Sequence, residues 1–326
     1  MQVSTMSPDL LYLSNEHVQK LRISAHEARE AVFAAFRDHA AGRNIGLPKS
    51  TIRITNGSFI SMSSASKVDG IAVAKWVSVV PIEGHQLRSR INGLVCVSDF
   101  GTGVPIAVLD GNSITQIRTA AMSTAAAFYL APVAPTTIGL IGCGLQAQAH
   151  LDAFVELYPS VRRIHLLSRS VSSAERIAAA TSEKQLKPIV STDPDKLLRD
   201  SDIVVSMVPS SSDLKPFLDA RLLQHSSFAS AVDGGRSWRS ETLSSFDRLV
   251  TDSLEQSRSP VDASNRPVEC ISYQEDLGRL ASGSLPVRSP IRALFGFRGF
   301  VIADLALAQL AVRKARERGL GMMLSR

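Results

Sequence analysis

A pair of glycines at the end of an apolar run most constrains what this chain can fold into. The stretch IGLIGCGLQAQAH, residues 138–150, contains GCGLQA, which fits the pattern G-x-G-x-x-A between a buried strand and a helix. Gly142 would permit the sharp turn, and Gly144 would let a pyrophosphate reach the backbone amides. Ala147 would let the helix pack closely on the strand, and the helix N-terminus would attract the phosphates. The stretch therefore predicts a dinucleotide-binding turn rather than an ordinary tight turn.

The chain after residue 136 alternates between short apolar runs and helical segments. One helix is expected to begin at Asp193-Pro194, and another at the capping-box pair Ser172 and Glu175. Alternation of this kind is typical of a parallel sheet that helices cover on both faces. The predicted fold class is α/β, with a Rossmann-type dinucleotide-binding domain over residues 118–298.

The rest of the chain has a different texture. Short runs between residues 49 and 109 are separated by Asn-Gly, Asp-Gly and Gly-Thr-Gly, which predicts a meander of antiparallel strands. Residues 16–42 and the segment that follows Gly299 have the apolar spacing of helices. We therefore expect a second, α+β domain built from residues 1–117 and 299–326.

The residues after the second strand of the α/β domain bear on the choice of dinucleotide. An Asp or Glu at this place would bind the ribose hydroxyls of NAD. The sequence HLLSRS instead places Ser168 and Arg169 there, and no carboxylate follows before Glu175. A hydroxyl and a guanidinium suit the 2′-phosphate of NADP, so we predict NADP(H), with NAD(H) as the alternative if Arg169 is an ordinary solvated loop residue. The residues expected to bind the cofactor are Gly142, Gly144, Leu145, Gln146, Ser168, Arg169, Met207 and Val208.

Three charged residues stand in places where a charge is either costly or useful. Lys75 interrupts an apolar strand, Arg118 lies near the start of a helix of small residues, and Asp233 follows a parallel strand. From spacing alone each has an ordinary alternative: a strand-face charge, a surface helix residue, and a turn or cap residue. Together beside a nicotinamide, the two cations would hold a substrate carboxylate and Asp233 would exchange a proton with nitrogen or water.

Composition and charge exclude several other classes of protein. The chain of 326 residues is 44% hydrophobic and 20% charged, which indicates a globular core. Its net charge of +6 is dispersed, and the densest basic patch, residues 311–319, is expected to be the solvated face of a terminal helix, so we predict no nucleic-acid partner. The three cysteines lie far apart and no CxxC or HExxH occurs, so neither a disulfide framework nor a metal site is expected. With no basic, apolar leader and no long apolar run, we predict a cytoplasmic protein without a membrane partner.

Several longer segments carry a more specific signal. They are DGNSITQIRTAAMSTAAAFYLA, IGLIGCGLQAQAHLDAF, AKWVSVVP, TGVPIAVLDG, LVTDSLEQSR and IADLALAQLAVRKARERGLG. Spread over nearly the whole chain, they resemble the ornithine cyclodeaminase/mu-crystallin family. The resemblance implies that Lys75 and Arg118 contact the substrate carboxylate, with Lys49 assisting. It implies that Lys75 and Asp233 are both catalytic. Asp233 would donate or accept the proton beside the nicotinamide. It also implies that the α+β domain binds substrate and pairs two chains into a homodimer.

The reaction expected from this resemblance is hydride transfer at the α-carbon of an amino or imino acid. The leading hypothesis is NADPH-dependent reduction of a cyclic ketimine, 1-pyrroline-2-carboxylate or 1-piperideine-2-carboxylate, to proline or pipecolate. The alternatives are an ornithine cyclodeaminase with bound NAD, a dehydrogenase of an amino-acid conjugate on the way to 2,3-diaminopropionate, an alanine-dehydrogenase-type enzyme, and a crystallin-like binding protein without activity. Four departures from the family pattern leave the substrate open, two of them in residues 258–278 and in the run LFGFRGFVIAD. Lys49 stands where many members have an arginine, and the loop after Asp233 is longer than usual.

Overall fold

The chain forms two compact units. The computed structural model describes residues 9–55, 57–80, 91–209, 214–258, 271–283 and 291–326. One unit comprises Met1–Arg118 and Phe300–Arg326, and the other comprises Thr119–Gly299. The division falls inside helix α3, Gly111–Leu130, and just before helix α9, Ile302–Arg318.

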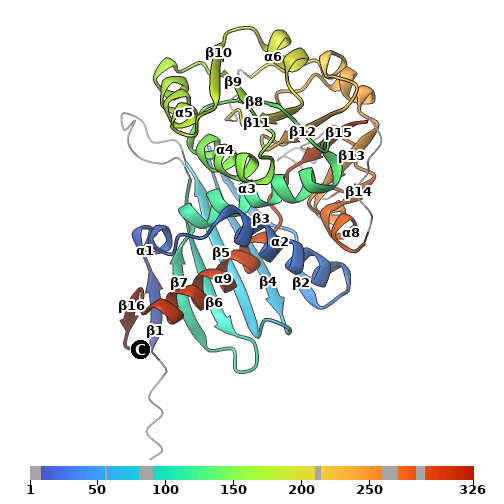
Figure 1. The fold of residues 1–326 in the computed structure, drawn as a ribbon. Helices are drawn as coiled ribbons and strands as arrows, with labels where there is room; N and C mark the ends of the chain where they lie inside the picture. The colour runs from blue at the N-terminus through green and yellow to red at the C-terminus, as the bar shows by residue number, and fades with distance from the viewer. Residues whose placement is uncertain (1–8, 56, 81–90, 210–213, 259–270, 284–290) are drawn as a thin grey trace, which may run out of the picture. The chain divides into compact units, whose positions relative to one another are not determined.

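The first unit contains, within its described residues, an eight-stranded sheet in the order β16-β1-β7-β6-β5-β4-β2, with β3 paired to β4 (Figure 1). The strands are β1 Leu10–Leu13, β2 Asn44–Gly46, β3 Ser50–Ile54, β4 Gly57–Ser66, β5 Ile71–Val79, β6 Ile91–Asp99, β7 Pro105–Asp110 and β16 Met322–Leu324. Strands β3 to β7 form an antiparallel meander, as predicted, and β1 joins it in parallel with β7.

Helices cover one face of this sheet. Helix α9 packs against β2, β4 and β5 and lies beside α2, Ala25–Ala40, and α1, Asn15–Lys20, packs against β1 and β7 (Figure 1). The register places Met62, Lys75, Val95 and Leu109 in one cross-strand row, and all four side chains are buried. Because side chains alternate along a strand, the neighbouring row, which includes Trp76, points to the opposite face.

Two expectations for the helices of this unit were wrong in part. The helix predicted over residues 16–42 is two helices, because Ser24 caps a new helix with Glu27 in a capping box, and Arg22 before it adopts a left-handed φ of 45°. In the basic patch 311–319, Lys314 is buried and donates to Glu27, whereas the arginines of the patch are exposed. That patch is therefore solvated except at Lys314.

The second unit is a doubly wound parallel sheet in the order β10-β9-β8-β11-β12-β15-β13-β14. Its strands are β8 Thr137–Ile141, β9 Arg163–Leu167, β10 Lys187–Ser191, β11 Ile203–Ser206, β12 Ser227–Ala231, β13 Arg248–Thr251, β14 Glu275–Asp276 and β15 Arg292–Gly296. Its helices besides α3 are α4 Leu145–Leu157, α5 Val171–Glu183, α6 Pro194–Asp200, α7 Leu254–Arg258 and α8 Leu277–Ala281, with the short 3-10 helices η1 Ala220–Leu222 and η2 Ser240–Ser245. The first strand, β8, lies at the centre, where the order reverses between β9 and β11. This is the Rossmann arrangement, and it confirms the predicted fold class.

The start of α5 corrects a smaller prediction. Ser170 caps this helix by accepting from the backbone N–H of Ser173, so the expected capping pair, Ser172 and Glu175, lies inside the helix. Ser170 is the capping residue because its backbone is extended, as this position requires, whereas Ser172 already lies in the helix. The Asp193 cap of α6 is confirmed. In the described part of the chain no helix has the length and apolarity needed to cross a bilayer. Cys270 lies outside the described residues.

Candidate active site

Lys75 is the central charged group of the first unit. It lies in the middle of β5 on the face that α9 covers, and its side chain is completely buried. Its Nζ donates to Asp304 Oδ1 at 2.6 Å and to Thr115 Oγ1 at 2.7 Å. Burial lowers the pKa of Lys75 to about 8, while the Asp304 carboxylate opposes this change and the nearby Arg118 adds to it. The ammonium group is therefore held in place but titrates close to neutral pH.

Arg118 meets the same carboxylate from α3. Its Nε lies 3.5 Å from Asp304 Oδ1, and its side chain is nearly buried. Asp304 Oδ2 is also buried and has no hydrogen-bond partner among the described residues. The three side chains of Lys75, Arg118 and Asp304 together carry one net positive charge in a setting where charges are costly. An anion such as a substrate carboxylate is favoured beside them.

Asp304 was not predicted as a site residue from the sequence. The residue lies in the first turn of α9, is 0% exposed, and is surrounded along the chain by buried Ile, Ala and Leu. The signal that could have found it is the one that identified Lys75, a charged residue inside an apolar run. A charge at such a position is rarely buried without a partner. Reading both runs together would have suggested that they pair.

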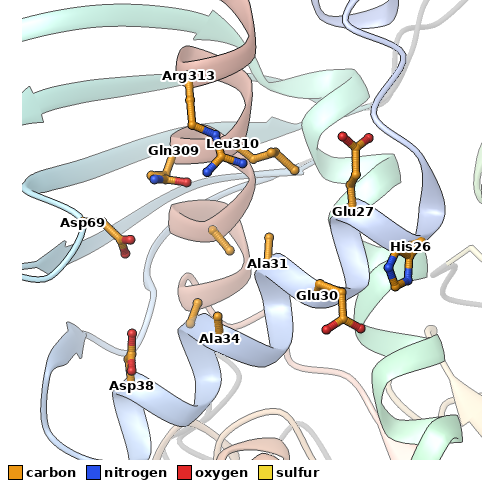
Figure 2. Close-up of a pocket in the computed structure, with 12 residues that line it drawn as sticks. His26, Glu27, Glu30, Ala31, Ala34, Asp38, Asp69, Gln309, Leu310 and Arg313 are labelled. Carbon is orange, nitrogen blue, oxygen red and sulfur yellow. The ribbon is translucent and has the colours of Figure 1, made fainter.

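Lys49 lies in the connection between β2 and β3 and is half-buried. Its contact with substrate stays a prediction. A hollow elsewhere in this unit, between α2 and α9, is lined by Glu27, Glu30, Asp38 and Arg313 among others (Figure 2). None of the predicted site residues lines it.

Asp233 is the central acid of the second unit. It follows β12 at the carboxyl edge of the parallel sheet and is 3% exposed. Ser237 Oγ donates to its Oδ2 at 2.5 Å, while Ser206 Oγ and the backbone N–H of Gly235 each donate to Oδ1 at 3.1 Å. Burial raises the pKa of Asp233, and these hydrogen bonds oppose the rise. The carboxyl group retains a proton to a higher pH than an ordinary Asp.

Two serines that orient this acid were not predicted. Ser206 ends β11 and also accepts from Trp238 Nε1 at 3.1 Å, so its hydroxyl is directed toward Asp233. Ser237 lies in the longer loop after Asp233, which the sequence analysis noted as a departure from the family pattern. Serines at strand ends and in loops are too common for sequence alone to have identified either one.

The glycine loop between β8 and α4 has the features that a dinucleotide phosphate requires. Gly142 has a φ of +90°, and a Cβ there would lie 2.8 Å from the carbonyl oxygen of Met207. A Cβ on Gly144 would meet nothing within 4 Å, so this residue, the N-cap of α4, borders open space and provides no side-chain cap. The Oε1 atom of Gln146 is buried without a hydrogen-bond partner among the described residues. The open space beside this helix N-terminus fits a bound pyrophosphate, to which backbone N–H groups would donate. The Gln146 Oε1 can only accept and so would face a donor such as a ribose hydroxyl, not a phosphate oxygen.

The other predicted cofactor residues lie around this loop. Met207 and Val208 follow β11 and lie against Gly142, and Leu145 begins α4 with its side chain 60% exposed. The backbone N–H of Gly142 donates to the carbonyl of Leu167 at 2.8 Å, which joins the loop to the end of β9. Ser168 and the exposed Arg169 follow directly. These residues are close in space, and their contacts with a cofactor stay predictions.

A buried hydrogen-bond chain fixes the start of α4. His150 Nδ1 lies 2.8 Å from the carbonyl of Gln146, which can only accept, so Nδ1 carries the hydrogen and Nε2 accepts from Ser123 Oγ at 2.9 Å. Ser123 Oγ also lies 2.9 Å from Ser230 Oγ. Burial lowers the pKa of His150 to about 4, so it remains neutral. The chain joins α3, α4 and β12 and has no exposed atom for chemistry, so we assign it a structural role.

The fold defines a class of protein, that of doubly wound parallel sheets of the Rossmann type. Comparison with known proteins is more specific. The chain belongs to the ornithine cyclodeaminase/mu-crystallin family, whose sequence profile matches residues 9–319. Among the described residues there is no cluster of three His, Cys, Asp or Glu side chains that could bind a metal ion.

Several relatives have names that indicate an activity. The Δ1-pyrroline-2-carboxylate reductase of Bacillus cereus is 26% identical over 96% of this chain and 98% of its own length. The Δ1-pyrroline-2-carboxylate/Δ1-piperideine-2-carboxylate reductase of Azospirillum brasilense is 32% identical over 54% of this chain and 56% of its own. The structure of Thermococcus litoralis Δ1-pyrroline-2-carboxylate reductase in complex with NADH and L-proline superposes with a TM-score of 0.85, at 25% identity over 96% of this chain and 99% of that one.

Proposed function

We propose that this chain is an NADP(H)-dependent oxidoreductase that reduces the cyclic ketimines 1-pyrroline-2-carboxylate or 1-piperideine-2-carboxylate to proline or pipecolate. The observation that carries the proposal is the buried cluster of Lys75, Arg118 and Asp304, with its net positive charge. A buried cationic group selects for a substrate with a carboxylate. The names of the two bacterial relatives support an imino acid as that substrate.

In the proposed reaction, Lys75 and Arg118 bind the substrate carboxylate, with Lys49 assisting. Asp304 and Thr115 hold the Lys75 ammonium in one rotamer, so that its remaining hydrogen can be donated to the substrate. Two fixed cations on one carboxylate orient the planar imino acid. Orientation of this kind contributes to the rate because the reacting carbon is already placed when the substrate binds.

Asp233 supplies the proton in the proposed reaction. A bound nicotinamide provides the hydride for the α-carbon. Reduction of the C=N bond also needs one proton on nitrogen if the imine binds neutral, and Asp233 provides it directly or through water. Its raised pKa keeps the carboxyl protonated at a pH where an ordinary Asp is ionised, and Ser206 and Ser237 keep it in one orientation. In the reverse direction the same group accepts the proton.

The preference for NADP(H) rests on the residues after β9. Ser168 and Arg169 occupy the place where NAD-binding sheets carry an acid, and Arg169 is exposed with no carboxylate bound to it in the described part of the chain. The solved relative was prepared with NADH, so the choice of dinucleotide in this chain needs its own measurement.

We also propose that the protein is a homodimer that pairs through the face of the first unit's sheet opposite α9. Ile52, Trp76 and Leu94 on this sheet are 57%, 47% and 49% exposed, and Phe59 stacks on Trp76 with ring centroids 5.7 Å apart. A contiguous apolar face of this kind is typical of a protein interface. Light scattering would report the mass of the particle in solution.

The activity is tested with purified protein, NADPH or NADH, and the two cyclic ketimines, followed by the absorbance of the reduced nicotinamide. The proposal expects oxidation of NADPH with a ketimine and formation of proline or pipecolate. Ornithine alone is the informative control. Proline and ammonia formed from ornithine without net change of cofactor would overturn the proposal in favour of a cyclodeaminase.

A further inference from the structure

Arg176 reaches from helix α5 to the phosphate loop. Its Nη2 donates to the carbonyl oxygen of Cys143 at 2.9 Å and lies 3.4 Å from that of Gly144. Cys143 stands between the two glycines of the loop, so this guanidinium is attached to the segment that would approach the dinucleotide. Arg176 was not predicted as a site residue from the sequence.

The positive charge of Arg176 is not neutralised by an acidic side chain among the described residues. No carboxylate forms an ion pair with it among the described residues, and its Nε and Nη1 make no hydrogen bond there, although Nη2 is engaged. Arg169, at the end of β9, is likewise exposed and bound to no described carboxylate. Two arginines without acidic partners therefore adjoin the same loop, which is linked to the end of β9 by the bond from Gly142 to Leu167.

The position of these arginines indicates what they bind. In a doubly wound sheet, the end of the second strand is where the adenosine ribose lies. A phosphate monoester on that ribose carries a charge of about −1.5 to −2 at neutral pH, and guanidinium groups bind phosphate through paired N–H donors. A ribose without the phosphate presents only neutral hydroxyls, and two cations beside it would gain nothing.

We propose that Arg176 is a second guanidinium for the 2′-phosphate of NADP(H), beside Ser168 and Arg169. The proposal rests on the NADP(H) preference proposed above. It adds a residue that determines how much more tightly NADPH binds than NADH. Arg176 is anchored by the loop carbonyls through Nη2, so its position is fixed before the dinucleotide binds and its Nε and Nη1 donate to the phosphate. Anchoring reduces the side-chain entropy lost on binding.

The test is the affinity for four probes, NADPH, NADH, 2′,5′-ADP and 5′-AMP, measured by calorimetry on wild type, Arg176→Gln and Arg169→Gln. Arg163→Gln is the matched control, because Arg163 is an exposed arginine at the opposite end of β9. We expect Arg176→Gln to weaken NADPH and 2′,5′-ADP by about tenfold or more and to leave NADH and 5′-AMP within about twofold. The melting temperature should change little, because the side chain is exposed and its replacement removes only the bonds from Nη2 to the loop carbonyls.

Equal weakening of NADPH and NADH would show that Arg176 only holds the loop, and no change in either affinity would show that it does not contact the cofactor. Both results overturn the inference. A wild-type protein that binds NADPH no better than NADH contradicts the proposed preference instead. The ratio in Arg176→Gln then still decides whether this residue touches the 2′-phosphate.

Discussion

Replacing Asp304 by Asn tests the buried cluster that carries the proposed function. The substitution keeps the size of the side chain and removes the charge that faces Lys75 at 2.6 Å. At pH 7 the ammonium form of Lys75 in the wild type is favoured by only about 1.4 kcal/mol, because its pKa is about 8. Removing one partner of a buried ion pair costs about 3 to 5 kcal/mol. Lys75 therefore loses its proton at pH 7 in the variant.

A neutral amine no longer attracts the substrate carboxylate. A hydrogen bond to a charged group contributes about 1.5 to 3 kcal/mol, which corresponds to about 10- to 150-fold in affinity. We expect the KM for the ketimine to rise by that factor in Asp304→Asn, with a smaller change in kcat. Lowering the pH should restore part of the affinity, because Lys75 then regains its proton. In the wild type, KM should rise only above about pH 8, where Lys75 loses its proton.

The assay is steady-state kinetics between pH 5.5 and 9, together with NADPH affinity measured without substrate. Glu317→Gln is the control, since Glu317 is an exposed acid on the same helix. The reasoning is refuted if Asp304→Asn folds and binds NADPH but has the KM and pH profile of the wild type. It is also refuted if the KM of the variant is raised equally at every pH, because a purely structural defect has no titration.

Three further outcomes are expected. Gly144→Ala should reduce NADPH affinity about tenfold without changing the melting temperature, because its Cβ enters open space, whereas Gly142→Ala should destabilise the fold through a contact of 2.8 Å with a backbone carbonyl. Calorimetry and thermal melts distinguish the two. Asp233→Asn should lower kcat for reduction by about 10²- to 10⁴-fold, because the proton donor is lost. In the wild type, a pH–rate profile should show kcat falling as the pH rises through the raised pKa of Asp233. If the protein is the proposed dimer, Trp76→Lys should convert it to a monomer, as light scattering would show, while the same change at the exposed turn residue Val68 should not.

Much of the fold was predictable because its signals are local. The alternation after residue 136 and the glycines at 142 and 144 depend on neighbouring residues, and the parallel sheet followed from them. The antiparallel meander was predictable for the same reason, since Asn-Gly, Asp-Gly and Gly-Thr-Gly separate its apolar runs in the sequence. Lys75 and Asp233 could be selected as candidate residues because a charge in an apolar strand, or at the carboxyl edge of a parallel sheet, is unusual.

The pairing of charges was not predictable. Lys75 and Asp304 are 229 residues apart in sequence, and only the packing of α9 on β5 brings them together. Arg176 was missed because an arginine in a helix is ordinarily a solvated residue, and its contact with Cys143 depends on the packing of one helix beside another. The break before Ser24 was missed although its signal was present in the sequence. Ser24 and Glu27 have the S-x-x-E spacing of a helix start, but the apolar spacing on both sides predicted one continuous helix.

The most direct test of the central claim is the path of the hydride. NADPH carrying deuterium at the transferable C4 position would be incubated with the protein and 1-pyrroline-2-carboxylate or 1-piperideine-2-carboxylate, and the product examined by mass spectrometry and proton NMR. The account predicts proline or pipecolate with one deuterium on the α-carbon, formed about 10²- to 10⁴-fold more slowly by Asp233→Asn. Product without deuterium, or deuterated cofactor left unchanged with both imino acids, would contradict it.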